Sequence, residues 1–187
     1  ITRSTAEELA GRGWLINEFA QEMRLHIPTY TLEGDEKRKL RTAWNKFKRE
    51  NHQVVEWTHE EPASVALAKE VTELWRADKE VSDREVRFLT RPIIYGAEND
   101  TRRFFVKNAD GAVVGLYIFD PLYENGNVIG YSTAFKRRMP NGMTGLEEAF
   151  TYWAVEKFRE EGMTWLNLGM IPLYQRRMIS LLKSILK

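Results

Sequence analysis

Two spacings of apolar residues alternate along this chain and divide it into helical and extended segments. Apolar residues three or four positions apart predict helices over about 4–26, 35–51, 62–75 and 144–161. A hydroxyl residue at the start of the first helix can cap it, and Pro28 follows its end. The apolar face of that helix would comprise Leu9, Trp14, Leu15, Phe19, Met23 and Leu25.

Between these helices the pattern changes to strand-forming residues. Segments 103–107, 112–119 and 128–135 are rich in β-branched and aromatic residues, and Asn-Ala-Asp-Gly and Glu-Asn-Gly-Asn turns separate them. We expect an antiparallel meander whose middle strand is buried on both faces and ends at an Asp-Pro pair. A shorter strand is expected over Gln53–Thr58.

A further strand is predicted from Trp165, after a helix that Gly162 would end. Asn167 is a polar residue inside this apolar strand, and Gly169 follows where the strand is expected to end. Ligands of open α/β sheets bind at the carboxyl ends of strands, which makes these two residues candidates for a binding cleft. The alternative is that both only shape a turn.

The amino-acid composition restricts the functions that the chain can have. The chain has 187 residues, 43% of them hydrophobic, which is enough for one domain with a substantial core. Its net charge of +1 provides no global attraction to nucleic acid or membranes, so any anion binding must be local. The absence of cysteine excludes disulfides and thiol chemistry, and the three scattered histidines lack the spacing of metal ligands.

The location of the protein is also constrained by its sequence. No apolar run is long enough to cross a membrane, and no signal peptide is visible. We therefore expect a cytoplasmic protein without a transmembrane segment. The chain opens at Ile1 rather than at a methionine, which fits a processed or excised piece of something longer.

Basic residues precede the helix that starts near Thr144. We expect segment 136–145 to be a basic, glycine-bearing loop that leads into this helix, an arrangement that binds phosphate through helix N–H groups and charged side chains. The alternative is an ordinary capped turn with surface arginines. The anion-binding candidates are Lys136, Arg137, Arg138, Asn141 and Gly142.

The predicted helix over 35–51 is strongly basic away from its apolar face. This pattern fits either a solvated surface helix or a helix that contacts phosphates. Its basic residues are Lys37, Arg38, Lys39, Arg41, Lys46, Lys48 and Arg49.

One stretch carries a resemblance to a known family. Residues 165–173, Trp-Leu-Asn-Leu-Gly-Met-Ile-Pro-Leu, resemble the Asn-Leu-Gly-Met-x-Pro-Leu signature of the C-terminal domain of phosphatidylglycerol lysyltransferases. These proteins belong to the aminoacyl-tRNA-dependent branch of GNAT-like acyltransferases. Leu40–Lys46 is similar to the family's basic helix, Gly111–Phe119 to its central strand, and Asn141-Gly142 to its helix start.

The resemblance implies an α/β (α+β) GNAT-like fold with a mixed, mostly antiparallel sheet and helices on both faces. It implies one such domain over residues 1–187, often half of a tandem pair. It also implies transfer of lysine or alanine from aminoacyl-tRNA to a lipid head group at the inner membrane face. Aminoacyl-tRNA or acyl-CoA would be the donor, tRNA and a lipid surface the partners, and no bound cofactor is firmly predicted.

The resemblance also selects site residues. Where the family has Asp-Leu-Met-Arg, this chain has Thr-Ala-Phe-Lys, which ends at Lys136. The family's acid after its helix start aligns with Gly145, and Glu147 lies close by. We expect Lys136, Glu147 and Tyr131 to be catalytic, Arg137, Arg138, Asn141 and Gly142 to bind the donor, and Asn167 and Gly169 to line the acyl cleft.

Two other functions remain open from the sequence. An acetyl-CoA-dependent N-acetyltransferase is one, because Arg138–Gly145 partly matches the loop that grips the pyrophosphate of coenzyme A. A non-catalytic half of a larger enzyme is the other, which would bind nucleic acid or a membrane surface through the basic helix over 35–51 and a predicted last helix over 173–187. The acceptor and the oligomeric state are not fixed by the sequence.

Overall fold

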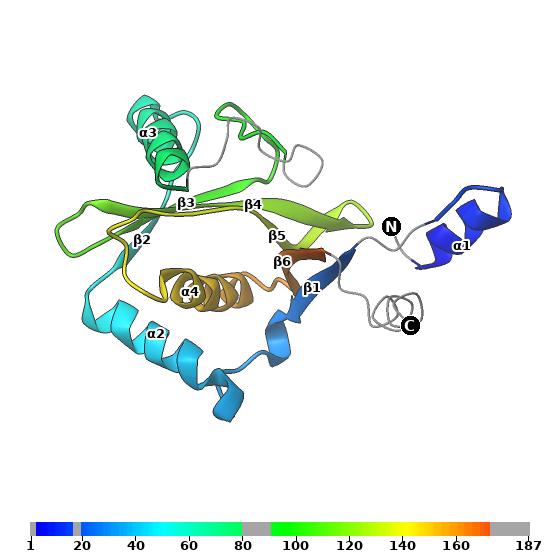
Figure 1. Cartoon of the computed structure of the whole chain (residues 1–187), viewed down its shortest axis with the longest axis horizontal. Coiled ribbons are helices and arrows are strands. Elements are labelled where there is room, and N and C mark those ends of the chain that lie inside the picture. The colour runs from blue at the N-terminus through cyan, green and yellow to red at the C-terminus, as the bar shows by residue number, and fades with distance from the viewer. Residues whose placement is uncertain (1–2, 17–19, 80–90, 173–187) are drawn as a thin grey trace, which may run out of the picture. The chain divides into compact units, whose positions relative to one another are not determined.

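The computed structural model describes residues 3–16, 20–79 and 91–172 (Figure 1). The sequence also predicts a short helical segment that carries Val86, and both this segment and the predicted last helix over 173–187 lie outside these residues. The elements are α1 (Arg3–Gly11), β1 (Ala20–His26), η1 (Ile27–Thr29), η2 (Asp35–Lys37), α2 (Arg38–Arg49), β2 (Gln53–Glu56), α3 (Pro62–Lys79), β3 (Arg102–Lys107), β4 (Val113–Glu124), β5 (Asn127–Arg138), α4 (Leu146–Glu160) and β6 (Trp165–Pro172).

The strands form a six-stranded sheet with the order β1-β6-β5-β4-β3-β2. Neighbours from β2 to β5 are antiparallel, and β6 joins β5 in parallel. The β4–β5 hairpin turns at Asn125 and Gly126, whose φ angles of 51° and 80° are the positive values that a tight two-residue hairpin turn requires. The predicted antiparallel meander is therefore confirmed.

Helices cover both faces of the sheet. Figure 1 shows α4 and α2 on one side and α3 on the other. Phe104 and Phe119 pack with α2 and α4 in one core cluster, whereas Phe105 and Ile118 pack with α3 in a second cluster. Adjacent residues of β3 and β4 thus enter opposite cores, as strand alternation demands. The predicted architecture, including a central strand buried on both faces, is confirmed.

The chain falls into two compact units. One is Arg24–Leu168, which holds α2, α3, α4 and strands β2 to β5. Within it, Arg159 of α4 donates hydrogen bonds to the backbone oxygens of Ile27 (2.8 Å) and Tyr30 (2.5 Å), which fixes η1 against α4. The other unit is assigned to Ile1–Met23 and Gly169–Lys187, and α1 is its described helix. A single domain over residues 1–187 stays a prediction.

The predicted long first helix is wrong. α1 ends at Gly11, and residues from Ala20 form strand β1. Gly13 has a φ of 88°, a left-handed conformation that ends helices. Trp14 and Leu15, which were assigned to the apolar face, are 67% and 102% exposed. The helical spacing of apolar residues across this break was a coincidence.

Three predicted strand ends also need correction. β4 continues past the Asp-Pro pair to Glu124, which is tolerated because Pro121 pairs with β5 only, beyond the reach of β3. β5 extends to Arg138, so the first three residues of the predicted basic loop belong to a strand. β6 continues to Pro172, so Asn167 and Gly169 lie within the strand rather than at its end.

Candidate functional site

A β-bulge near the end of β5 decides which way its basic residues point. Thr133 pairs with Phe119 and Phe135 pairs with Ile118, so the pairing steps over Ala134. Beyond the bulge, Lys136 pairs with Tyr117, which belongs to the core cluster on the α4 side of the sheet. Because strand residues alternate, Lys136 and Arg138 lie on the α4 side and Arg137 on the α3 side.

The predicted group of three basic residues is therefore divided by the sheet. The Arg137 side chain is 2% exposed, and its guanidinium lies 4.5 Å from the ring centroid of Trp75 in α3. Stacking of this kind stabilises a buried guanidinium. Arg137 does not share a binding site with Arg138, because both belong to strand β5 and not to the predicted loop, and neighbouring strand residues face opposite sides.

A tight turn connects β5 to α4. The N–H of Gly142 donates to the oxygen of Met139 (2.9 Å), and Nη1 of Arg138 donates to the oxygen of Gly142 (3.1 Å). A Cβ at Gly142 would lie 3.0 Å from the oxygen of Met139 and 3.1 Å from that of Val114, so a larger residue would displace the turn. Gly142 thus positions Arg138, while Asn141 is exposed on the turn.

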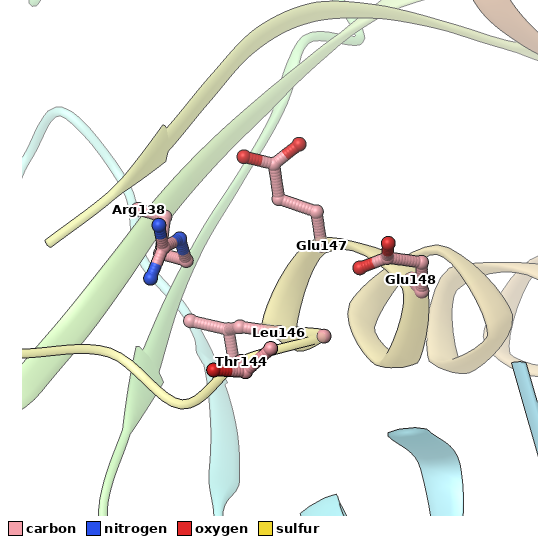
Figure 2. A pocket seen from close by; sticks show the side chains of 6 residues that line it. Arg138, Thr144, Leu146, Glu147 and Glu148 are labelled. Carbon is pink, nitrogen blue, oxygen red and sulfur yellow. The ribbon is translucent and has the colours of Figure 1, made fainter. Parts of the chain in front are cut away.

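The first turn of α4 and the end of β5 enclose a pocket of about 280 Å³. Figure 2 shows Arg138 of β5 and Glu147 of α4 on opposite sides of it, with Glu148 beside Glu147. Gly145 caps the helix with a φ of 85° and contributes no side chain. The pocket therefore combines one guanidinium with two carboxylates at a helix N-terminus. Its lining residues are Arg138, Thr144, Gly145, Leu146, Glu147 and Glu148.

Lys136 lies next to this pocket on the same side of β5. Burial lowers the pKa of its ammonium, and the carboxylates of Glu147 and Glu148 partly oppose that effect. A lysine held this way loses its proton more easily than an exposed one and is suited to proton transfer. Lys136, Arg138 and Glu147 are the predicted site residues that the fold brings together.

Tyr131 lies far from this group. It precedes Lys136 by five positions on one strand, which corresponds to about 16 Å. Its ring stacks on Phe158 with centroids 4.5 Å apart, and the guanidinium of Arg102 lies 5.7 Å from its centroid. Tyr131 cannot touch the same reacting atom as Lys136 and Glu147.

Asn167, one of the two predicted acyl-cleft residues, lies on the face of the sheet opposite the pocket. Leu166 and Leu168 pack against the α4-side cluster, which puts the intervening Asn167 on the opposite face of β6. Asn167 is 3% exposed, and its backbone oxygen accepts a hydrogen bond from Oγ1 of Thr133 (3.2 Å). Gly169 has a φ of 103° within β6 and is assigned to the other compact unit.

Two further features concern only the part of the chain that the structure describes. Its helices include none that is both long and apolar enough to span a bilayer. Its histidine and carboxylate side chains form no group of three or more that could hold a metal ion.

Comparisons with known proteins place the chain in a family. The family described as "Phosphatidylglycerol lysyltransferase, C-terminal" matches residues 1–183. The chain belongs to this family. It is 27% identical over 163 residues to a phosphatidylglycerol lysyltransferase of Bacillus subtilis, a match that covers 86% of this chain and 18% of that protein. The chain thus spans about a fifth of the length of this curated relative.

Solved structures show the same fold. The structure of L-PGS from Bacillus licheniformis matches 84% of this chain and 48% of that chain, with a TM-score of 0.64 and 19% identity. The C-terminal domain of a candidate lysylphosphatidylglycerol synthetase from Agrobacterium fabrum matches 98% and 56%, with a TM-score of 0.71 and 15% identity. These likenesses show that the chain shares the fold of these two structures, with the predicted mixed, mostly antiparallel sheet and helices on both faces.

One residue beside the pocket of this lysyltransferase-family domain was missed from the sequence. Tyr117 pairs with Lys136 across β4 and β5, and its ring stacks on Phe150 of α4 with centroids 3.7 Å apart. In the sequence it is one aromatic residue in a buried strand, with no signal beyond core packing. Only the register of the two strands brings it next to the predicted site residues.

Proposed function

We propose that this domain transfers an aminoacyl group from aminoacyl-tRNA to a hydroxyl of a lipid head group, and that the pocket at the start of α4 holds the reacting group. Family membership supports the reaction type. The observation that carries the proposal is the grouping of Arg138, Glu147 and Glu148 around one pocket beside the half-buried Lys136. We also propose that this domain is one half of a tandem enzyme and that it acts at the cytoplasmic face of a membrane.

The charges of the pocket fit an aminoacyl ester. The two carboxylates attract the ammonium of the amino acid. Arg138 stabilises the negative charge that develops on the carbonyl oxygen of the ester when the acceptor attacks. The acceptor oxygen forms a bond to the ester carbon, and the bond to the ribose oxygen breaks. The proton of the acceptor hydroxyl passes to Lys136 or Glu147 and then to the departing ribose oxygen.

The same charges disfavour the coenzyme A alternative. A pyrophosphate at the α4 N-terminus would face the carboxylates of Glu147 and Glu148, and like charges repel each other. The turn N–H of Gly142 already donates to Met139 rather than outward. The pocket is thus better matched to a zwitterion than to a polyanion.

The basic face of α2 is proposed as the contact for the tRNA backbone. Ala43 and Phe47 bury the opposite face of α2 against the core, and Trp44 packs edge-on against Tyr152 of α4 (5.3 Å between centroids). The helix is therefore held in one orientation with its basic residues outward. The exposed members of this basic face are Arg38, Lys39, Lys48 and Arg49.

Transfer of labelled lysine and alanine from their tRNAs to phosphatidylglycerol vesicles tests the proposed reaction. We expect Glu147→Gln to lower the rate at least about 100-fold, because a group that binds or moves a proton at the reacting centre is lost. Glu160→Gln, an exposed acid on the same helix, is the matched control and should retain activity. Tight tRNA binding without any transfer would favour the non-catalytic alternative and refute the proposed reaction.

Salt dependence tests the proposed tRNA surface separately. We expect the double variant Arg38→Gln/Arg49→Gln to weaken tRNA binding and to reduce the slope of log affinity against log salt by about 1 to 2. Glu70→Gln is the control, because Glu70 is an exposed acid of α3 and does not belong to the basic face of α2. This variant should leave the slope unchanged. An unchanged slope in the double variant would remove α2 from the interface.

A further inference from the structure

Tyr117 presents a buried hydroxyl without a hydrogen-bond partner in the described part of the chain. The side chain is 1% exposed, so bulk water does not satisfy the hydroxyl. A buried polar group without a partner destabilises the folded state, and such groups are rare enough to need an explanation. Phenylalanine would fill the same space at this position without that cost.

The ring of Tyr117 extends along the sheet toward the pocket. A Cβ built on Gly115 would lie 2.8 Å from Cε2 of Tyr117, 3.5 Å from its Cζ and 3.4 Å from Cδ2 of Leu146. The hydroxyl end of the ring therefore lies over Gly115, beside the first residue of α4, which lines the pocket. The missing side chain of Gly115 leaves the room that this orientation needs.

The electrostatic surroundings agree with this placement. Burial raises the pKa of the Tyr117 hydroxyl, Glu147 raises it further, and Arg138 opposes them. Both of these charged residues line the pocket. The hydroxyl thus stays protonated and is a hydrogen-bond donor at neutral pH.

We propose that Tyr117 is a ligand-binding residue of this pocket, whose hydroxyl donates a hydrogen bond to the carbonyl oxygen of a bound aminoacyl group while Glu147 and Glu148 hold its ammonium. This inference rests on the proposed function and specifies how the pocket recognises its substrate. It assigns the buried hydroxyl a partner that is present only when substrate is bound.

A structural role makes different predictions. If Tyr117 only packs on Phe150, its hydroxyl is inert, and Tyr117→Phe affects neither ligand binding nor transfer. If the hydroxyl instead satisfies a structural partner, the same substitution lowers stability. A ligand-binding role predicts weaker binding together with unchanged or increased stability, because the unsatisfied group is removed.

Two probes isolate the carbonyl contact. Lysinamide carries ammonium groups and a carbonyl oxygen, whereas cadaverine is the same diamine skeleton without the carbonyl. We expect Tyr117→Phe to weaken lysinamide binding roughly tenfold, the effect of one hydrogen bond, and to leave cadaverine binding unchanged in a titration followed by NMR. Tyr123→Phe is the matched control, because Tyr123 is exposed and donates to Asp100 (2.6 Å) away from the pocket.

The outcomes separate this inference from the proposed function. Equal lysinamide affinity in wild type and Tyr117→Phe overturns the role of Tyr117, even if Glu147→Gln abolishes the binding of both amines and the pocket itself is upheld. Equal weakening of lysinamide and cadaverine also overturns it, because the effect would not depend on the carbonyl. No binding of either amine to the wild-type chain overturns both the pocket and the inference.

Discussion

The two ends of helix α4 hold charged groups in opposite ways. At its C-terminal end, Arg102 donates to Glu161 (2.7 Å) and Glu56 (2.7 Å), and its guanidinium lies 5.6 Å from the ring centroid of Phe158. Burial alone would lower the pKa of Arg102, but hydrogen bonds to the two carboxylates raise it above its ordinary value. At this end of α4, the cation of Arg102 is thus paired with carboxylates.

At the N-terminal end of α4, the polar and charged side chains are only partly paired. Burial lowers the pKa of Lys136, and the hydroxyl of Tyr117 has no hydrogen-bond partner among the described residues. Proteins retain such unfavourable arrangements where substrate supplies the missing contacts. The comparison indicates that one end of α4 stabilises the fold while the other end is kept ready for a ligand, and four substitutions test it.

The largest effect is expected at the paired end. Arg102→Met should lower the free energy of unfolding by about 2–3 kcal/mol, because it removes the partly buried cation that pairs with Glu161 and Glu56 and leaves these two carboxylates close together. Urea denaturation measures the change. Lys46→Met breaks an exposed ion pair with Glu50 (3.7 Å) and should cost less than about 0.5 kcal/mol. Equal losses in the two variants would mean that the Arg102 cluster is no more stabilising than a surface pair.

The turn between β5 and α4 gives the next effect. Gly142→Ala should lower stability by about 1–2 kcal/mol and should also impair transfer, because the added methyl group pushes against two backbone oxygens and the stem of Arg138. Gly96→Ala is the control: a Cβ there meets nothing within 4 Å, so stability should stay the same or rise slightly. Full activity of Gly142→Ala would show that Arg138 does not depend on this turn.

Local sequence signals predicted most of the sheet. The meander was predictable because Asn125-Gly126 requires a turn and because the flanking segments are apolar over strand lengths. The first helix failed because Gly11 and Gly13 end a helix even when apolar spacing continues beyond them. The end of β4 was also missed, since its pairing with β5, which continues to Glu124, and not its composition decides how far it extends.

The candidate site was predictable only in part, for a physical reason. A bulge at Ala134 reverses the facing of every later residue in β5, so it decides that Lys136 and Arg138, and not Arg137, lie on the α4 side of the sheet. No residue type near the end of β5 indicates a bulge. Tyr117 enters the site through its register with Lys136, a contact between distant parts of the sequence that one-dimensional patterns do not contain.

A smaller effect of opposite sign is expected for Lys136. Lys136→Met should raise stability by about 1 kcal/mol at pH 7, since it removes a charge that burial disfavours, and should abolish transfer. Because the folded-state pKa is lowered, wild type gains stability as pH rises from that pKa toward the ordinary 10.5, so the advantage of the variant should shrink over this range. The charged groups that face Lys136 are Glu147, Glu148 and Arg138. Lys39→Met, at an exposed position of α2, should leave both the stability and its pH dependence unchanged.

The smallest effect is a pH dependence at the paired end. Burial would raise the pKa of Glu161, but hydrogen bonds from Arg102 and Lys157 lower it below its ordinary 4.5. Its pairing therefore stabilises the fold above pH 4.5, and this stability is lost as pH falls through the folded-state pKa. Glu161→Gln should be less stable than wild type by under about 1 kcal/mol at pH 7, and the difference should vanish once the pH lies below the folded-state pKa of Glu161.

Denaturation curves of wild type, Glu161→Gln and the exposed neighbour Glu160→Gln at several pH values measure this dependence. Convergence of wild type and Glu161→Gln at low pH, with Glu160→Gln equal to wild type throughout, would attribute the stabilisation to the ionised Glu161 and not to its packing. A difference that stays constant with pH would contradict this, because it would mean that the carboxylate acts through shape alone. In that case the contrast between the ends of α4 would rest on Arg102 and Glu56 without Glu161.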